Sequence, residues 1–572
     1  MMNPVKQPVS MIRWILPLSF VAWLSIATSA PADDADRQDV QATSAAESFE
    51  TIQREGLAEQ YSHWPEDLKI NGRIIVYNEW DDLRELRPLL ERTLKSRSVL
   101  SIESSSDPQS SNWSEALAQA AGDSGSFTTL SSANASTNLL SAAIDVVDCV
   151  CMQSVPGGPD GVLGLSDSLH ALIQRGGMLI ADLSVARRFG KYVFPPNDKG
   201  KCQLGLNLLP DCLVESTAQR SSMLEALQSC SPAVGISMDE GTVMMLSGRK
   251  ILSFGSGSTT LSVVAETAKS PMSVSLSSAT ENRRRAPQRY MADLTQWRRI
   301  AIDRQLPPFP GEQPPAPYVE NGTLIIIGGG GSPRTAMRRF MELAGGTQSA
   351  RLLYVPCSEK ETVGERHGMV ENWKRMGVQH ATFIHSKDRR QANSDPEFLS
   401  QLKGTTGIFF GGGRQWNFSD SYYGTRTHAM MKDVLRRGGV IAGSSAGASI
   451  QGRYLARATP IGNFDIMAPG YERGGLGFLP GVAIDQHFSQ RGRQKDMQQL
   501  VRTYPQLLGI GIDESTAIEV QKSEAKVSGR GRVFFYDNRD PTKEEPTVIA
   551  LPAGSVYDLQ KRKVLVDTRK EE

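Results

Sequence analysis

The sequence predicts an α/β protein of two tandem domains, each with a mostly parallel sheet that is covered by helices on both faces. Two observations lead to this prediction. Apolar runs of strand length alternate with helical patterns along both halves of the 572-residue chain. Short motifs of the first half also return, in the same order, in the second half. A chain of this length is too long for one typical domain.

The returning motifs indicate a tandem duplication. They pair residues 71–76 with 321–326, 98–102 with 351–355, 175–177 with 437–439, 209–210 with 479–480, and 235–242 with 509–516. Because the order is kept, we expect a first domain over 33–305 and a second over 321–572. The proline-rich stretch 306–320 between them is typical of a stiff linker.

The N-terminus has the pattern of an export signal. Lys6 and Arg13 precede an apolar stretch over 14–26, and Ala-Pro-Ala at 30–32 resembles a cleavage site. These features predict a signal peptide over 1–32 and a secreted or periplasmic protein with no membrane contact after cleavage. An uncleaved membrane anchor is the alternative.

Composition excludes several classes of function. The chain is 39% hydrophobic and 22% charged, as in a globular protein, and its net charge of +1 does not favour nucleic acid. We interpret the basic run 283–285 as a solvated surface. The six cysteines fit no zinc pattern, and some of them are expected to pair after export. We expect no metal or organic cofactor, and the serine-rich region 101–141 is predicted to be loop or insertion.

The second half contains the pattern of a nucleophile elbow. Residues 443–447, Gly-Ser-Ser-Ala-Gly, follow the apolar run 440–442 and match G-x-S-x-G. In such an elbow Ser445 is the nucleophile, and the N–H of Ala446 points into an oxyanion hole. The alternative is an ordinary glycine-serine turn at the end of a strand.

A base and an orienting carboxylate are available at neighbouring strand ends. A serine hydroxyl needs an adjacent base, and His487 follows the apolar strand pattern that ends at Asp485. Glu514 follows the apolar strand 508–512 and is a candidate to orient the imidazole, with Asp513 as its competitor. Side chains alternate along a strand, so only one of these two acids is expected to face the site.

Two glycine-rich turns also follow apolar strands. The turn in 409–415 is a candidate to present backbone N–H groups to an oxyanion while Gln415 holds a substrate group. A phosphate is the alternative ligand. The turn in 327–332 resembles a dinucleotide loop but lacks its spacing.

The first half lacks these groups. Residues 182–186 correspond to 443–447; a serine, Ser184, persists there, but both glycines are missing. Residues 215–218 correspond to 485–488 and contain no histidine, whereas Glu240 corresponds to Glu514. We therefore expect the first domain to be inactive.

Together, the motifs at 443–448, 485–488, 491–493 and 511–517 resemble those of cyanophycinases, serine peptidases related to aspartyl dipeptidases. The resemblance covers about residues 321–540. It implies a flavodoxin-like (class I glutamine-amidotransferase-like) fold and a serine-histidine-glutamate triad. By matching positions, the triad is Ser445, His487 and Glu514, the oxyanion hole is Gly413 and Ala446, and the substrate-binding residues are Gln415, Asp485, Gln486, Arg491 and Arg493.

The resemblance also implies a substrate. Cyanophycinases cleave a polymer of aspartate that carries arginine on each β-carboxyl, so cyanophycin or a related β-aspartyl or acidic peptide is expected. Two positions depart from the family pattern: Asp496 stands where the family has arginine, and Arg414 where it has an acid. An aspartyl-dipeptidase-like peptidase and a non-catalytic binding pseudoenzyme are the alternatives. Because relatives are commonly dimers, the first domain is predicted to act as an internal pseudo-partner.

Overall fold

The structure is a computed structural model, and it describes most of the chain beyond residue 63. The described residues are Trp64, Leu68, 70–78, 87–103, 117–122, 124–131, 135–153, 162–194, 202–230, 232–264, 270–277, 290–461 and 465–570. The predicted signal peptide over 1–32 and the basic run 283–285 lie outside the described residues.

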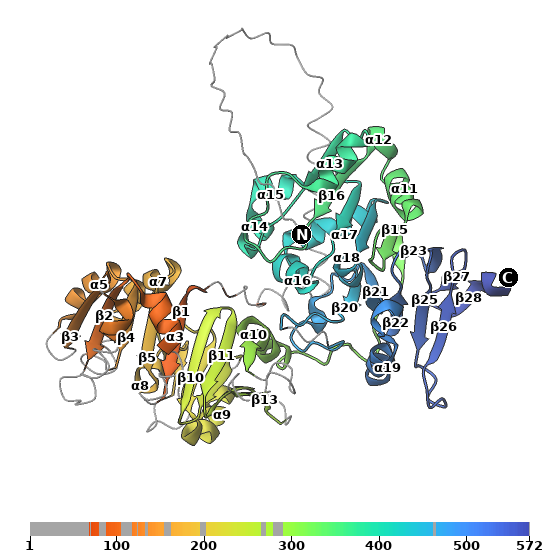
Figure 1. The fold of residues 1–572 in the computed structure, drawn as a ribbon. Coiled ribbons are helices and arrows are strands. Elements are labelled where there is room, and N and C mark those ends of the chain that lie inside the picture. The colour runs from red at the N-terminus through yellow and green to blue at the C-terminus, as the bar shows by residue number, and fades with distance from the viewer. Residues whose placement is uncertain are drawn as a thin grey trace, which may run out of the picture. The chain divides into compact units, whose positions relative to one another are not determined.

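The first half has a large mixed sheet with the strand order β14-β11-β10-β1-β5-β4-β2-β3 (Figure 1). The neighbours from β1 to β3 pair in parallel, whereas β10, β11 and β14 extend the sheet in antiparallel pairs. Their bounds are β1 Ile70–Tyr77, β2 Ser98–Glu103, β3 Ser126–Ser131, β4 Cys149–Met152, β5 Met178–Asp182, β10 Thr242–Gly248, β11 Lys250–Gly255 and β14 Met291–Asp293.

A smaller sheet and several helices complete this half. The smaller sheet has the order β13-β12-β9-β8, and β6 pairs with β7. These strands are β6 Tyr192–Val193, β7 Gln203–Leu204, β8 Cys212–Ser216, β9 Val234–Met238, β12 Ser258–Val263 and β13 Met272–Ser277. The helices are α3 Arg87–Leu94, α5 Thr137–Asp145, α7 Ser166–Gln174, α8 Leu183–Ala186, η2 Thr217–Gln219, α9 Arg220–Ser229 and α10 Leu294–Asp303.

The second half has a large sheet with the order β17-β16-β18-β19-β15-β23-β24-β27-β28. Again the five strands from β17 to β15 pair in parallel and the others in antiparallel pairs. Their bounds are β15 Val319–Ile327, β16 Arg351–Val355, β17 His380–Phe383, β18 Gly407–Phe410, β19 Val440–Ser444, β23 Thr516–Lys522, β24 Glu524–Gly529, β27 Val556–Asp558 and β28 Lys563–Val566.

The second half also has a smaller sheet, with the order β20-β21-β22-β25-β26. Its strands are β20 Gly452–Tyr454, β21 Leu479–Gln486, β22 Leu508–Ile512, β25 Val533–Asp537 and β26 Thr547–Leu551. The helices are α11 Arg334–Leu343, α12 Gly346–Ser349, α13 Gly368–Arg375, α14 Arg389–Ser394, α15 Pro396–Ser400, α16 Trp416–Tyr422, α17 Arg426–Arg436, α18 Ala446–Ser449, η3 Glu472–Gly474, η4 Ser489–Arg491, α19 Gln494–Thr503 and η5 Thr568–Lys570.

The two large sheets repeat one strand order. Read from β3 to β14, the first sheet has the order and pairing directions that the second has from β17 to β27. Their registers also agree with the sequence motifs, because Arg73 pairs with Met178 on β5, and Thr323 pairs with Val440 on β19. Both β1 and β15 carry a register shift at their start. The predicted fold class of two tandem α/β domains is confirmed.

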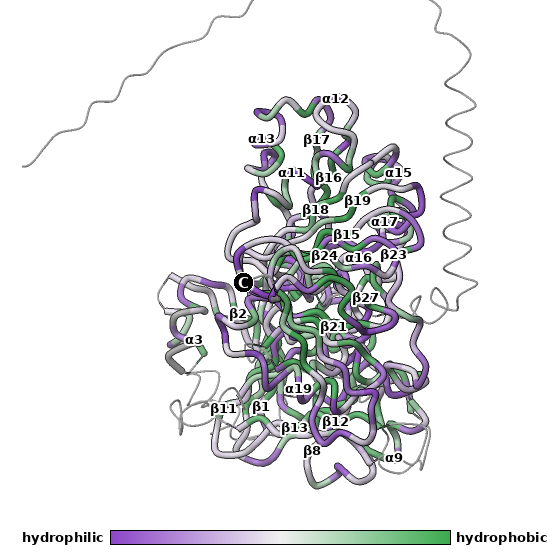
Figure 2. Tube along the Cα trace, turned by 90° about the vertical axis from the view of Figure 1, so that its right-hand side faces the viewer, coloured by the Kyte–Doolittle hydropathy of each residue, from purple (hydrophilic) through white to green (hydrophobic). Residues whose placement is uncertain are grey.

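The central strands of each large sheet are buried on both faces, as their continuous apolar sequences predict. Along β15, Leu324 and Ile326 enter one hydrophobic cluster, whereas Ile325 and Ile327 enter another that contains Phe340 of α11. This alternation places core on either side of the sheet. In Figure 2 the tube is green along β18 and β19, the strands that end at the candidate site.

The serine-rich region 101–141 is only partly a loop, so that prediction was wrong in part. It contains β3, which pairs in parallel with β2, and the first residues of α5, whose N-terminus is capped by the hydroxyl of Ser136. The strand is an edge strand with several exposed residues. Serine and threonine fit such a strand because they need no apolar partner on its solvent side.

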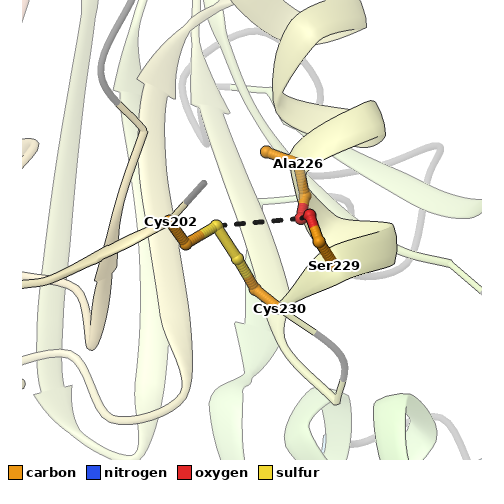
Figure 3. Close-up of a disulfide and its surroundings, with 4 residues drawn as sticks. All are labelled: Cys202, Ala226, Ser229 and Cys230. Carbon is orange, nitrogen blue, oxygen red and sulfur yellow. Dashed lines mark hydrogen bonds between the residues drawn. A yellow bond between two sulfur atoms is a disulfide. The ribbon is translucent and has the colours of Figure 1, made fainter. Parts of the chain in front are cut away.

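Between the halves, no regular element is described from the end of α10 at Asp303 to the start of β15 at Val319, so β15 begins within the stretch 306–320 that was predicted as a linker. Among the described residues, no helix is both long and apolar enough to span a bilayer. Cys202 and Cys230 form a disulfide beside the C-terminal end of α9, where the Cys202 sulfur also lies 3.8 Å from the carbonyl oxygen of Ala226 (Figure 3).

Candidate active site

Ser445 occupies a sharp turn between β19 and α18. Its φ is +58°, a conformation that side-chain-bearing residues rarely adopt, and its N–H donates to the carbonyl of Ile327 at 3.0 Å. The two flanking glycines are required by close contacts. A β-carbon at Gly443 would overlap the carbonyl of Gly447, and one at Gly447 would overlap the carbonyl of Phe410. The predicted elbow is therefore present, and Ser445 stays partly exposed in it.

His487 lies within hydrogen-bond distance of Ser445. It follows β21, and its Nε2 is 2.9 Å from the Ser445 Oγ. Its Nδ1 is 2.6 Å from Oε1 of Glu514, which follows the neighbouring parallel strand β22. With the Nδ1–H donated to the carboxylate, Nε2 is left to accept the serine proton. The three groups predicted from separate strand ends thus form one continuous chain.

The electrostatics of His487 favour a base. Burial of the imidazole lowers the pKa of His487 below its usual value, and the nearby charges of Arg491 and Arg493 act in the same direction. The hydrogen bond to Glu514 opposes this shift without cancelling it. The imidazole is therefore neutral at neutral pH, which is the form that removes a proton from a hydroxyl.

Asp513, the competitor of Glu514, has a structural contact instead. Its Oδ1 accepts from the N–H of Ser489 at 2.9 Å and its Oδ2 from that of Arg532 at 3.0 Å. Glu514 turns to the other side, and its own N–H donates to the Gln490 side chain at 3.0 Å. The alternation along the strand end thus separates a loop-holding acid from the acid beside the imidazole.

The glycine-rich loop after β15 forms the support under this pair. A β-carbon at Gly329 would overlap the imidazole of His487, and one at Gly330 would overlap the carboxylate of Glu514. The carbonyl of Gly328 accepts from the His487 N–H at 2.8 Å. In the sequence this loop resembles a dinucleotide loop, whereas in the structure the side chains of His487 and Glu514 pack against it. The signal for its role was its position, after the strand that pairs with β19.

The second glycine-rich turn lies beside the nucleophile. A β-carbon at Gly412 would lie 3.5 Å from the Ser445 Cβ, in ordinary contact. Gly413 is the next residue of this turn. Ala446 is the first residue of α18, so the N–H of Ala446 has no partner inside that helix. Gln415 is buried, and its Nε2 donates to the carbonyls of Ala456 and Arg457, both at 2.7 Å. Its amide nitrogen is therefore committed to the backbone rather than to a ligand.

A buried network of charges adjoins the site. Asp485 is fully buried, with Oδ2 accepting from Arg457 at 2.8 Å and Oδ1 from Arg493 at 2.7 Å. Arg457 also donates to the half-exposed Asp496 at 2.6 Å. The sequence placed Asp485 and Arg493 among the substrate-binding residues but missed Arg457, which is distant in the chain and carries no motif.

Two further residues that were predicted to bind substrate are Arg491 and Gln486. Arg491 is exposed on η4, and its charge lowers the pKa of His487, so it lies near the imidazole. The Oε1 of Gln486 is buried without a hydrogen-bond partner among the described residues. A buried carbonyl oxygen without a partner is costly, and a donor on a ligand would relieve that cost.

In the first half, strand register identifies the corresponding positions. Asp182 pairs at the end of β1 as Ser444 does at the end of β15, so Leu183 corresponds to the nucleophile. The expected correspondence with Ser184 was therefore wrong by one residue, although the match of 175–177 with 437–439, continued without a gap, places Leu183 at Ser445. The same comparison of β8–β9 with β21–β22 places Thr217 at the position of His487.

Within the residues that the structure describes, no group of three acidic, histidine or cysteine side chains is arranged to hold a metal. The chemistry offered by the described site is that of serine, imidazole and carboxylate.

Comparisons with known proteins identify relatives of the second half. A sequence model described as peptidase family S51 matches residues 324–528, all within the second half. Cyanophycinase from Geminocystis herdmanii (strain PCC 6308) is 30% identical over 224 residues, 38% of this chain and 81% of the relative. Cyanophycinase from Trichormus variabilis (strain ATCC 29413 / PCC 7937) is 28% identical over 257 residues, 43% of this chain and 83% of the relative.

Among solved structures, a peptidase from an acI-B1 Actinobacterium is 22% identical and matches with a TM-score of 0.30, covering 42% of this chain and 97% of that one. The sequence relatives define the class of the protein as a peptidase, and hence a hydrolase. The chain belongs to peptidase family S51. The resemblance to cyanophycinases is thereby confirmed.

Proposed function

We propose that the second half is a serine peptidase in which Ser445, His487 and Glu514 form the catalytic triad. The observation that carries the proposal is the hydrogen-bonded chain from the Ser445 Oγ through the imidazole to Glu514, with spacings of 2.9 and 2.6 Å. Such spacings are those of a nucleophile and its oriented base. The elbow conformation of Ser445 supports the same conclusion.

In this mechanism Ser445 attacks the carbonyl carbon of the scissile amide while His487 takes the hydroxyl proton. Glu514 holds the imidazole and stabilises the imidazolium that forms. The N–H groups of Gly413 and Ala446 stabilise the oxyanion. The imidazolium then gives its proton to the leaving amine, which departs and leaves an acyl group on Ser445. Water, activated by the same imidazole, releases the acid product and restores the serine.

For the substrate we propose cyanophycin or a related β-aspartyl peptide. Its support is the set of cyanophycinase relatives and the exposed cation of Arg491, because a guanidinium binds carboxylates in a two-pronged fashion. The unpartnered Oε1 of Gln486 suits a donor such as an amide or a guanidinium.

A second candidate, an aspartyl-dipeptidase-like activity, rests on a departure from the cyanophycinase pattern. Asp496 stands where the resemblance to cyanophycinases implies arginine, and here its carboxylate pairs with Arg457 at 2.6 Å. This position therefore carries an acid where the family offers a cation. A non-catalytic binding protein is the alternative that an absence of turnover would select.

The test is hydrolysis of insoluble cyanophycin by the full chain and by Ser445→Ala, with products identified by mass spectrometry. The proposal expects β-aspartyl-arginine from the unaltered chain and a loss of turnover of about 10⁶ in the variant. Release of α-aspartyl dipeptides alone would select the second candidate. Equal turnover by both proteins would remove Ser445 from the mechanism.

We further propose that the first half is an inactive copy of the catalytic domain and that the chain is exported. Leucine and threonine at the positions of the nucleophile and the base support the first statement. The Cys202–Cys230 disulfide supports export, because such bonds persist in oxidising compartments. Mass spectrometry of the protein recovered outside the cytoplasm tests export: a mature chain that begins after residue 32 is expected, and one that begins at Met1 would contradict signal cleavage.

A further inference from the structure

A buried carboxylate on α16 binds two arginines of the first half. Asp420 is fully buried, and its Oδ2 accepts from Arg249 at 2.6 Å while its Oδ1 accepts from Arg299. The hydroxyl of Tyr471 also donates to Oδ1, at 2.9 Å. Burial by itself raises the pKa of Asp420, but the charges of the two arginines outweigh burial and hold the pKa well below its usual range. The carboxylate is therefore ionised and fully paired.

Arg249 is held by a side chain of the first half, and Arg299 is carried on its helix α10. Arg249 lies between β10 and β11, and its Nε and Nη2 donate to Asp293 at 2.6 and 2.9 Å. Asp293 in turn caps α10, the helix that carries Arg299. Arg299 is fully buried, and its guanidinium lies over the rings of Trp64 and Tyr471, at 4.5 and 4.7 Å from their centroids. The pair therefore reaches α16 from a fixed support.

Helix α16 begins directly after the glycine-rich turn beside Ser445. Its first residue, Trp416, lies under the guanidinium of Arg249, 5.0 Å from the ring centroid. The next N–H groups, of Asn417 and Phe418, donate to the carbonyls of Arg414 and Gln415 at 3.0 and 3.1 Å. Arg249 thus contacts both the first residue of the helix and Asp420, so a displaced helix would carry the turn with it.

We propose that Arg249 and Arg299 of the first half are positioning residues for catalysis in the second. Through Asp420 they fix α16, and through α16 they fix the turn that places the Gly413 N–H at the developing oxyanion. The inference rests on the proposed serine mechanism and adds a role for the inactive half. Oxyanion donors act only when they are held in place before the reaction, so a shift of the turn lowers the rate at which Ser445 attacks a carbonyl carbon or the phosphorus of a phosphonyl group.

The test compares two neighbouring arginines of α10 in the full chain. Arg299→Met removes the contact with Asp420. Arg298→Met is the matched control, because Arg298 is also buried but pairs within the first half, with Asp211, at 3.0 and 2.8 Å. The readout is the rate at which a fluorophosphonate probe labels Ser445, measured well below the thermal midpoint of each variant. This reaction needs the activated serine and the oxyanion donors but not the natural substrate.

Labelling of Arg299→Met is expected to be about tenfold to a hundredfold slower, with partial recovery in Arg299→Lys and no change in Arg298→Met. If Arg299→Met shows no cooperative unfolding, Arg249→Met takes its place. The Arg249 side chain is 11% exposed, whereas that of Arg299 is fully buried, so its loss should disturb folding less. The positioning role is overturned, and the serine mechanism is not, in either of two cases. One is that Arg299→Met, or Arg249→Met in its place, is labelled as fast as the unaltered chain. The other is that the labelling rate of Arg298→Met falls by as much. No labelling of the unaltered chain would refute the serine mechanism itself, and the inference with it.

Discussion

The imidazole of His487 packs against the backbone of Gly329, at a position where a β-carbon would overlap the ring. The contact joins the loop after β15 to the base of the proposed triad. Gly329, which has no side chain, thus leaves the space that the imidazole occupies. The site therefore depends on the backbone of this loop as well as on the reactive side chains.

Gly329→Ala is expected to push the imidazole away from the Ser445 Oγ and to lower kcat by about a hundredfold. Gly331→Ala is the matched control. Both glycines have a positive φ, of +95° and +109°, so both variants carry backbone strain, but at Gly331 the nearest atom to a new β-carbon is 3.7 Å away. Steady-state kinetics, together with thermal unfolding of both variants, separates displacement of the imidazole from backbone strain. Equal losses of kcat would show that strain, not the imidazole contact, is responsible.

Glu514→Gln should lower kcat by about 10²–10⁴ and leave KM nearly unchanged, since the amide cannot stabilise the imidazolium. His487→Ala should lower kcat further, by a factor on the order of 10⁶, because the base itself is lost.

Asp513→Asn should instead weaken the two backbone contacts of its carboxylate and lower the free energy of unfolding by about 1–3 kcal/mol. A larger loss of kcat in Asp513→Asn than in Glu514→Gln would reverse the two assignments.

The pH dependence of kcat/KM should reflect the lowered pKa of His487. Because burial and nearby arginines disfavour the imidazolium, the base stays neutral to lower pH, and the acid limb should have its midpoint below about 6.5. Arg491→Gln removes one of these cations, so the midpoint should move to higher pH whatever happens to the maximal rate. A midpoint that moves to lower pH in this variant would contradict the electrostatic account.

Two acids of the network beside the site should differ in their effect on stability. Asp485→Asn leaves two buried arginines without a full counter-charge and should lower the free energy of unfolding by about 3 kcal/mol or more. Asp496 is half-exposed, so Asp496→Asn should cost at most about 1 kcal/mol. Urea unfolding measures both. A stable Asp485→Asn variant with a raised KM would return Asp485 to substrate binding, as the sequence resemblance implies.

The disulfide should stabilise the first half. It closes a loop with a sequence separation of 28, for which chain entropy gives roughly 3–4 kcal/mol. A reductant should therefore lower the thermal midpoint of the unaltered chain, and the double variant Cys202→Ser/Cys230→Ser should show a lower midpoint that no longer responds. An unresponsive unaltered chain would show that the two thiols are not joined.

The proximity of the proposed triad residues could be predicted from the sequence because they directly follow apolar strands, and the carboxyl ends of neighbouring parallel strands meet at one edge. Strand position alone could not decide between Asp513 and Glu514, because the choice depends on which side of one strand end faces His487; the resemblance to cyanophycinases named Glu514. The role of Gly329 was hidden for a similar reason: the atom that excludes a β-carbon belongs to a residue far along the chain.

The contact of Arg249 and Arg299 with Asp420 also left no signal in the sequence. The partners are separated by 171 and 121 residues, and an isolated arginine or aspartate is more often a surface residue. In the first half, the error of one residue at Ser184 arose because no glycine marks the elbow there; the match of 175–177 with 437–439, continued without a gap, would have given Leu183. Strand register supplied the correct position, Leu183.

The central claim is that Ser445, rather than its neighbour Ser444, is the nucleophile. Peptide mapping of the full chain after reaction with a fluorophosphonate tests it most directly, because the two serines are adjacent and only Ser445 lies 2.9 Å from the base. One adduct per chain, located on Ser445 and absent from His487→Ala, is the predicted result. An adduct on Ser444, or peptidase activity that survives in Ser445→Ala, would contradict the account.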